Sequence, residues 1–310
     1  MGTLNKRNKN WRDATKLVRG GTRRSDFAET NEAIFLTSGF VYESAKQAQR
    51  AFTGEEDRFI YSRFTNPTVG MFEERMALLE NAKACWATST GMAAVNAALF
   101  ASLKSGDRLV ASKALFGSCD YICRDLLPRF GVETLMVNGT DLDEWEAALR
   151  QPTAAVFMET PSNPQLDIID LTTVSKIAHK AGARVIVDNV LATPVLQKPL
   201  ELGADVVVYS ATKHIDGQGR AMGGCVLTDD LDWSNGDLKQ YMRHAGPSLS
   251  PFNAWILLKS LETLDIRIQQ HCRSAKKIAK FLENQRSIKR VLFPGLKSHP
   301  QYHPEINDQE

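Results

Sequence analysis

The feature that most constrains the fold is an alternation of short apolar segments with helical segments through the middle of the chain. The apolar segments are near-continuous rather than alternating, which is typical of parallel strands that helices bury on both faces. They lie at 84–89, 108–111, 132–137, 154–159, 184–188 and 205–209. Helical spacing predicts helices at 71–80, 120–130, 141–150 and 171–181, and another after Gly91. We therefore expect an α/β fold with a mostly parallel sheet covered by helices.

The two ends of the chain differ from this middle part. Residues 1–60 are polar and irregular, so we expect an N-terminal arm that makes contacts between subunits. A large domain is then expected at 61–255, and an incomplete C-terminal α+β domain at 256–310. In that last part the pattern predicts a long helix over 252–285 and a short strand over 289–293.

Composition excludes several classes of protein. The net charge is +2 over 310 residues, which is too balanced for a general electrostatic grip on nucleic acid. The basic start at Lys6, Arg7 and Lys9 is typical of a solvated face. No signal peptide and no 18-residue apolar run is present, so we expect a cytoplasmic protein without a membrane partner. The five cysteines are scattered and match no zinc ligand set, so no metal site is predicted.

Two neighbouring strands end in oppositely charged residues. Asp188 closes the apolar run 184–188, and Lys213 follows the run 205–209 closely. The carboxyl ends of strands line the ligand crevice in open parallel sheets, so both side chains are candidates for one site. Two other interpretations remain open, namely a buried salt bridge between them and ordinary strand-end residues in solvent.

Several further residues indicate an anionic ligand near Lys213. Ser210 and Thr212 supply hydroxyl groups, and Ser89-Thr90-Gly91-Met92 lies where a strand turns into a helix. The free N–H groups of such a turn bind anions, and the guanidinium of Arg63 suits a phosphate. A phosphate, a carbonyl that reacts with an amine and a ring nitrogen that needs an acid together describe pyridoxal 5'-phosphate (PLP).

At this point the sequence resembles the Cys/Met-metabolism family of PLP-dependent enzymes. The resemblance spans most of the chain and rests on stretches in the family's order and spacing. These are 61–68 (YSRFTNPT), 89–94 (STGMAA), 159–164 (ETPSNP), 187–189 (VDN), 210–219 (SATKHIDGQG) and 246–255 (GPSLSPFNAW). It implies the aspartate-aminotransferase-like fold, which is PLP-dependent transferase fold type I, with PLP as cofactor.

The resemblance also implies roles for individual residues. Lys213 would be the catalytic lysine that links covalently to PLP, and Asp188 would pair with the ring nitrogen. The phosphate would be bound by backbone N–H groups and hydroxyl groups, from Gly91, Met92, Ser210 and Thr212.

Four more residues take roles by the same resemblance. Tyr61, counted with the catalytic residues, and Arg63 would reach the phosphate of the neighbouring subunit. A shared site of this kind implies a homo-oligomer, a dimer of dimers. Phe116, where other branches of the family usually have Tyr, would stack on the ring, and Asn163 would lie near its 3-oxygen. For Phe116 an ordinary place in the core is the alternative.

The activity implied is γ-replacement on an O-acylhomoserine, with O-succinylhomoserine and sulfide giving homocysteine. The alternatives are cystathionine formation, γ-elimination, or a shortened PLP-binding protein without turnover. Family members continue beyond the length of this chain. The arginine that binds the substrate carboxylate lies in that part of their sequence, and no residue of 286–310 matches it.

Overall fold

The computed structural model describes residues 10–302, and its central feature is a seven-stranded sheet with the strand order β1-β7-β6-β5-β4-β2-β3. The pairs β2–β3, β2–β4 and β4–β5 are parallel, whereas β1 and β7 are antiparallel. The strands are β1 Ala84–Thr88, β2 Arg108–Ser112, β3 Glu133–Val137, β4 Ala155–Glu159, β5 Arg184–Asp188, β6 Val206–Ser210 and β7 Gly224–Thr228. The predicted α/β fold with a mostly parallel sheet is confirmed.

Two compact units divide the chain, and each combines segments that are distant in sequence. The first unit is Met1–Ala101 with Val208–Leu264, and the second is Ser102–Val207 with Asp265–Glu310. The predicted arm at 1–60, large domain at 61–255 and small domain at 256–310 stay a prediction.

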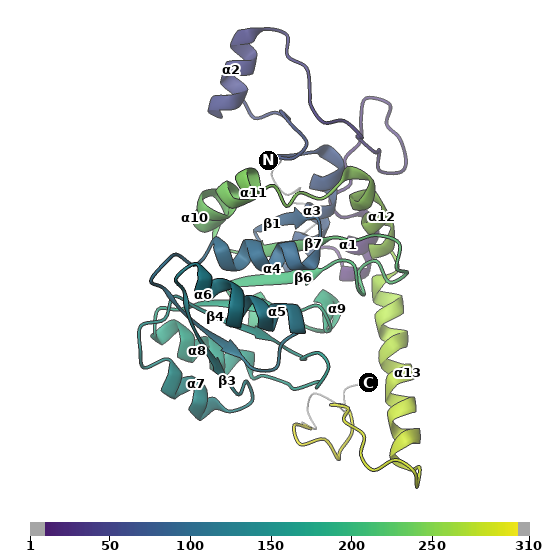
Figure 1. Cartoon of the computed structure of the whole chain (residues 1–310). Helices are drawn as coiled ribbons and strands as arrows, with labels where there is room; N and C mark the ends of the chain where they lie inside the picture. Colours follow the sequence, from purple (N-terminus) through teal and green to yellow (C-terminus); the bar gives the residue numbers. More distant parts are fainter. Residues whose placement is uncertain (1–9, 303–310) are drawn as a thin grey trace. The chain divides into compact units, whose positions relative to one another are not determined.

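In the first unit, helices flank the antiparallel pair β1–β7. Figure 1 shows α3 and α4 on opposite sides of these strands. Asn66 caps α3 by accepting from the N–H groups of Thr68 and Val69, and Pro67 begins the helix with a preset φ. The helices of this unit that begin before residue 260 are α1 Asp13–Arg19, α2 Ala45–Thr53, α3 Pro67–Glu80, α4 Gly91–Phe100, α10 Leu231–Trp233, α11 Lys239–Ala245 and α12 Pro251–Leu261.

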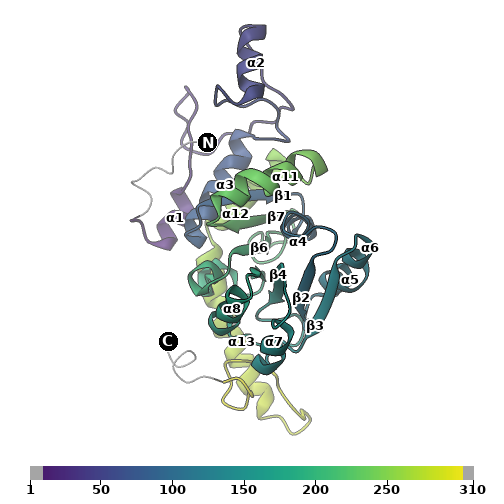
Figure 2. The same cartoon turned by 90° about the vertical axis from the view of Figure 1, so that its left-hand side faces the viewer.

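In the second unit, the parallel strands β2 to β5 lie between two layers of helices. Figure 2 shows α5 and α6 on one side and α7 and α8 on the other. The burial explains the unbroken apolar runs, since every residue of β4 is buried, Glu159 at its end included. The helices of this unit that begin before residue 260 are α5 Gly117–Tyr121, α6 Leu127–Arg129, α7 Leu142–Ala148, α8 Leu171–Lys180 and α9 Thr193–Leu196. A π-helical turn covers Ile122–Leu126 in this unit, and another covers Ser234–Leu238 in the first unit. A 3₁₀ turn covers Pro199–Leu202.

Two predictions about the C-terminal part were wrong in detail. The single helix expected over 252–285 is two helices, α12 and α13 (Leu264–Glu283). They are separated where the N–H and hydroxyl of Thr263 both bond to the carbonyl of Ser260, a local alternative to helical bonding. The strand expected over 289–293 is irregular chain, because within residues 10–302 no strand pairs with it. An apolar run without a partner cannot form the ladder of hydrogen bonds that defines a strand.

The basic residues Lys6, Arg7 and Lys9 lie outside the described residues. Over residues 10–302, no helix has both the length and the apolar character that crossing a bilayer requires.

Candidate active site

The beginning of α4 is a built anion site within the first unit. Thr90 caps the helix, and its hydroxyl accepts the N–H of Ala93 at 3.0 Å. In the described part of the chain, the N–H groups of Gly91 and Met92 have no hydrogen-bond partner. Unpaired N–H groups and the helix dipole together favour a negative group here.

Gly91 allows this helix to approach the end of β6 closely. A Cβ added at Gly91 would lie 2.4 Å from the Cβ and 2.7 Å from the Oγ of Ser210. The structure therefore brings the helix start and the Ser210 hydroxyl together, two of the groups that the sequence predicted for phosphate binding. Only glycine permits this distance.

Thr212 and Lys213 follow Ser210 in the turn after β6. The Thr212 hydroxyl donates to the carbonyl of Gly223 at 3.2 Å and accepts its N–H at 3.1 Å, so this side chain also holds the strand β7 in place. The side chain of Lys213 is exposed, and no acidic group within residues 10–302 forms an ion pair with it. A lysine placed in this way has an accessible amine.

In the second unit, Asp188 is a buried carboxyl group at the end of β5. It is 6% exposed, and its Oδ1 accepts the N–H of Val190 at 3.0 Å. Burial raises the pKa of Asp188 to about 7, because a desolvated carboxylate without a positive partner is unfavourable. Within the described residues no cation pairs with it.

Two residues that the sequence predicted as ring contacts lie in the same unit. Phe116 precedes α5 and is 41% exposed, so it is not an ordinary core residue. Asn163 is exposed in the loop after β4. The backbone N–H groups of both donate to one side chain, that of Glu159.

Sequence reasoning gave no role to Glu159, although the signal was present. It ends the apolar run AVFME of β4, as Asp188 ends RVIVD of β5. Burial, and then the neighbouring charge of Asp188, raises the pKa of Glu159 to about 8.

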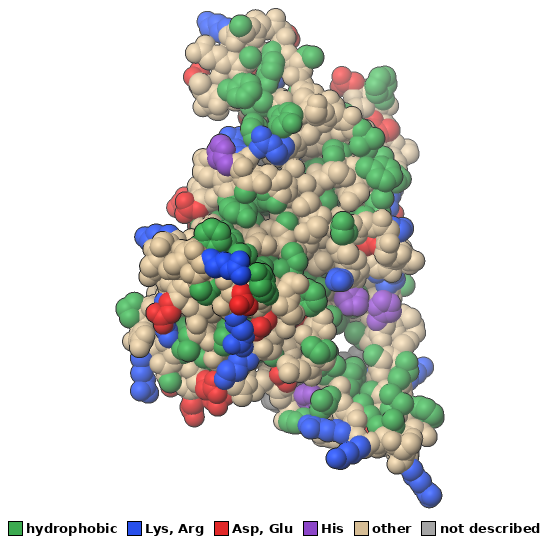
Figure 3. Space-filling model, in the orientation of Figure 1, with side chains coloured by type: hydrophobic (Ala, Val, Ile, Leu, Met, Phe, Trp, Pro, Cys, Tyr) green, Lys and Arg blue, Asp and Glu red, His purple; other side chains and the backbone are tan. Residues whose placement is uncertain are grey.

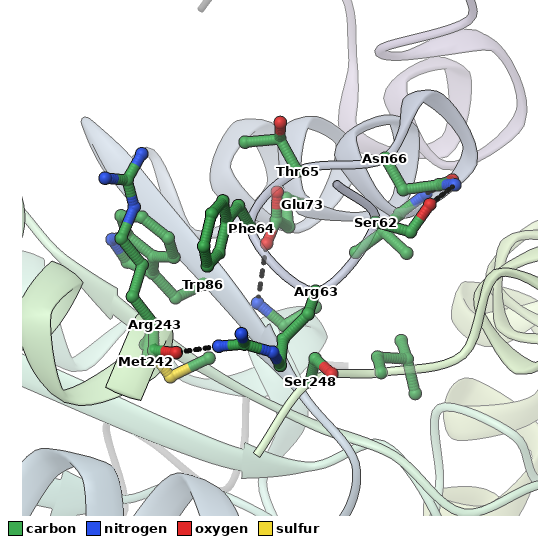
Figure 4. Close-up of a pocket in the computed structure, with 13 residues that line it drawn as sticks. Ser62, Arg63, Phe64, Thr65, Asn66, Glu73, Trp86, Met242, Arg243 and Ser248 are labelled. Carbon is green, nitrogen blue, oxygen red and sulfur yellow. Dashed lines mark hydrogen bonds between the residues drawn. The ribbon is translucent and has the colours of Figure 1, made fainter. Parts of the chain in front are cut away.

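Tyr61 and Arg63 belong to the first unit, and Arg63 lines a pocket there (Figure 4). Arg63 donates to the carbonyl of Arg243, and the two guanidiniums lie 4.9 and 4.8 Å from the ring centre of Phe64. Tyr61 is 41% exposed and meets Phe64 edge to face at 5.8 Å. The predicted reach of Tyr61 and Arg63 into a neighbouring subunit stays a prediction.

The same pocket contains a carboxyl group that the sequence did not single out. Glu73 accepts the N–H of Ala87 at 2.8 Å, the dashed line to an unlabelled nitrogen in Figure 4. Burial raises the pKa of Glu73 to about 7.

The sequence matches the family described as Cys/Met metabolism PLP-dependent enzyme over residues 14–309. The chain belongs to this family. An O-succinylhomoserine sulfhydrylase of Mycobacterium tuberculosis is 56% identical over 289 residues, which cover 93% of this chain and 71% of that protein. An L-methionine gamma-lyase of Porphyromonas gingivalis is 41% identical over 290 residues, with 93% and 73% covered.

A solved structure supports the family's fold and cofactor. The Campylobacter jejuni protein assigned as an O-acetylhomoserine (thiol)-lyase superposes with a TM-score of 0.91 at 32% identity, covering 96% of this chain and 82% of that one. It carries N'-pyridoxyl-lysine-5'-monophosphate. The chain described here is therefore a PLP-dependent enzyme of fold type I. Its relatives carry out elimination or replacement at the γ-carbon, and it belongs to the same group of enzymes.

The chain's own residues fit this cofactor. Asp188 is a buried acid that lacks a positive partner among the described residues, which is what a protonated ring nitrogen requires. The start of α4 offers two unpaired N–H groups beside a hydroxyl, which is what a phosphate requires.

Proposed function

We propose that this chain catalyses γ-replacement on O-succinylhomoserine, with sulfide as the nucleophile and homocysteine as the product. The observation that carries this choice is the 56% identity to an O-succinylhomoserine sulfhydrylase, against 41% to a methionine gamma-lyase over a similar length. The stretches 116–118 (FGS), 216–224 (DGQGRAMGG) and 248–264 are the parts of the sequence that resemble this branch most.

The proposal gives each candidate residue a role. When bound, PLP supplies an electron sink for negative charge that develops on the substrate. The Nζ of Lys213 would hold the cofactor covalently, and once displaced by the substrate amine it would act as the base that removes the proton of the α-carbon. The carboxylate of Asp188 would keep the ring nitrogen protonated, because a positive ring nitrogen stabilises the buried negative charge of the carboxylate.

The remaining residues bind and orient. The N–H groups of Gly91 and Met92 and the hydroxyl of Ser210 would bind the phosphate. Thr212 would donate to it after turning its hydroxyl proton away from the carbonyl of Gly223. The exposed ring of Phe116 would stack on the cofactor, and the side chain of Asn163 would lie near its 3-oxygen.

We further propose that the site is completed by a second copy of the chain, through Tyr61 and Arg63. Both side chains are exposed, so they are available to a neighbour. The segment before them carries several exposed apolar side chains, and Figure 3 shows green side chains on the projection that contains α2. The exposed apolar side chains of this segment include Phe27, Leu36, Val41 and Phe52. Exposed apolar surface is common where proteins contact one another.

γ-Elimination is a second candidate, since an L-methionine gamma-lyase is 41% identical to the chain. Elimination and replacement differ only in whether a thiol adds before the product leaves. A chain that binds PLP without turnover is the other alternative.

The test is a product assay on the purified protein with added PLP. We expect homocysteine from O-succinylhomoserine and sulfide, at a higher rate than cystathionine with cysteine or 2-oxobutyrate from methionine. Lys213→Ala should abolish both the visible absorbance of the bound cofactor and the product. Lys104→Ala, which removes another exposed lysine, is the matched control. Visible absorbance without any homocysteine would refute the proposed substrate, and the absence of cystathionine and 2-oxobutyrate as well would support the non-catalytic alternative.

A further inference from the structure

One buried side chain joins the two loops that carry the predicted ring contacts. Glu159, at the end of β4, is only 3% exposed. Its Oε2 accepts the N–H of Phe116 at 2.7 Å, and its Oε1 accepts the N–H of Asn163 at 3.1 Å. Both oxygens of one carboxyl group are therefore used to hold backbone from separate segments.

The two donors belong to different parts of the second unit. Phe116 lies at the turn that leads into α5, after β2, and Asn163 lies in the loop after β4. Phe116 is the N-cap residue of α5, and its side chain makes no capping hydrogen bond. The bond from its backbone N–H to Glu159 connects this position to the end of β4. Because the backbone sets the direction of each Cα–Cβ bond, a carboxyl group that fixes both backbones also fixes the points from which the two side chains extend.

The chemistry of the place explains why the residue is acidic. Two N–H donors 2.7 and 3.1 Å away are best accepted by an ionised carboxylate, which has no proton of its own. An amide would turn its NH2 toward one of the donors, and an aspartate would be one methylene too short.

Ionisation of Glu159 is unfavourable beside Asp188, and a bound cofactor would reduce this effect. Glu159 and Asp188 are register partners on the parallel strands β4 and β5, and both are buried. Two negative charges on adjacent strand ends repel each other in a desolvated environment. A protonated ring nitrogen paired with Asp188 would neutralise one of them, and so favour the ionised form of Glu159.

We propose that Glu159 is a positioning residue for the cofactor ring. Its carboxylate holds the backbones of Phe116 and Asn163, so that the side chain of Phe116 meets the face of the ring and that of Asn163 its 3-oxygen. This rests on the ring contacts given to Phe116 and Asn163 under the proposed function. It does not depend on which substrate the enzyme uses.

The test uses PLP binding without any substrate. In Glu159→Gln we expect PLP to dissociate about tenfold more readily, because one N–H loses its acceptor and faces another donor. The visible circular dichroism of the bound cofactor should also fall, because this signal reports the asymmetric surroundings of the ring. In the apoprotein, peptides that contain the Phe116 and Asn163 amides should exchange hydrogen for deuterium faster.

The control is Glu144→Gln in the same unit. The Oε2 of Glu144 accepts the N–H of Asn138 at 2.7 Å, the same kind of bond, but the side chain is 41% exposed. This variant should keep the affinity for PLP and the dichroism of the wild-type protein.

A double-mutant cycle separates positioning from simple stability. If Glu159 acts through Phe116, then Glu159→Gln should weaken PLP binding less in a Phe116→Ala background than in the wild type. Wild-type affinity and dichroism in Glu159→Gln would overturn the proposal, and so would full additivity in both the Phe116→Ala and Asn163→Ala backgrounds. Should Glu159→Gln not fold, Glu159→Asp is read by the same criteria, and wild-type dichroism in that variant overturns the proposal. A wild-type protein that binds PLP but forms no homocysteine would count against the proposed function alone.

Discussion

Gly91→Ala should disrupt the phosphate site at the beginning of α4. The added Cβ would lie 2.4 Å from the Cβ of Ser210 and 2.8 Å from its Cα. Since carbon atoms pack at roughly 3.5 Å or more, α4 and the end of β6 must separate by about 1 Å. Rotation of the Ser210 side chain cannot relieve a contact with its backbone.

The expected magnitude follows from that displacement. Overpacking of this kind costs about 1–3 kcal/mol of folding free energy. A shift of about 1 Å also takes the N–H groups of Gly91 and Met92 beyond hydrogen-bond distance of a bound phosphate. A hydrogen bond to a charged group contributes about 1.5–3 kcal/mol, so the loss of even one of the two bonds should lower PLP affinity on the order of 10- to 100-fold.

The assay compares Gly91→Ala with Gly117→Ala. Gly117 is likewise the first residue of a helix, α5, but a Cβ added there meets no atom within 4 Å. Both variants gain the same helix propensity, so the difference in unfolding free energy isolates the clash. Denaturant unfolding of the apoprotein and equilibrium titration with PLP are the two measurements. Equal stability of the two variants, with PLP affinity unchanged in Gly91→Ala, would refute the reasoning.

Three further changes test other parts of the structure. The pKa of Asp188 is raised to about 7 in the fold from 3.8, so the fold binds this proton more tightly than the unfolded chain does. Apoprotein stability should therefore fall as pH rises from about 4 through about 7, and Asp188→Asn should flatten that dependence in denaturant titrations at several pH values. Glu73→Gln keeps an acceptor for the N–H of Ala87 but removes a buried charge. Because the pKa of Glu73 is raised to about 7, the melting temperature of this variant should exceed the wild-type value clearly at about pH 8 and little at about pH 5. Equal differences in melting temperature at the two pH values would contradict the raised pKa. Arg75→Ala should cost about 3–5 kcal/mol in urea unfolding, since it removes a fully buried guanidinium that pairs with Glu32 at 2.5 Å and donates to the carbonyls of Gly20 and Leu258. Arg50→Ala breaks a half-exposed pair and should cost less than about 1 kcal/mol.

Local pattern was enough to predict most elements of this fold. The near-continuous apolar runs coincide with β1 to β6 to within one or two residues. In all of these strands except β3 the reason is burial on both faces, which leaves no polar side to interrupt the run, whereas β3 at the edge of the sheet is partly exposed. The failure at 289–293 has the same origin, since hydrophobicity records the tendency to be buried and not the presence of a partner strand. The antiparallel pairing of β7 with β1 also depends on a partner that is distant in sequence.

By itself, then, the sequence was enough to predict the α/β class and the family and to name the candidate cofactor ligands, because each of these depends on short runs of contiguous residues. Only the tertiary structure showed that Gly91 lies against Ser210, and that Glu159 accepts the N–H groups of Phe116 and Asn163. Those contacts join residues up to 119 positions apart, in the case of Ser210 and Gly91. Packing brings such groups together, and no local periodicity records the distance between them.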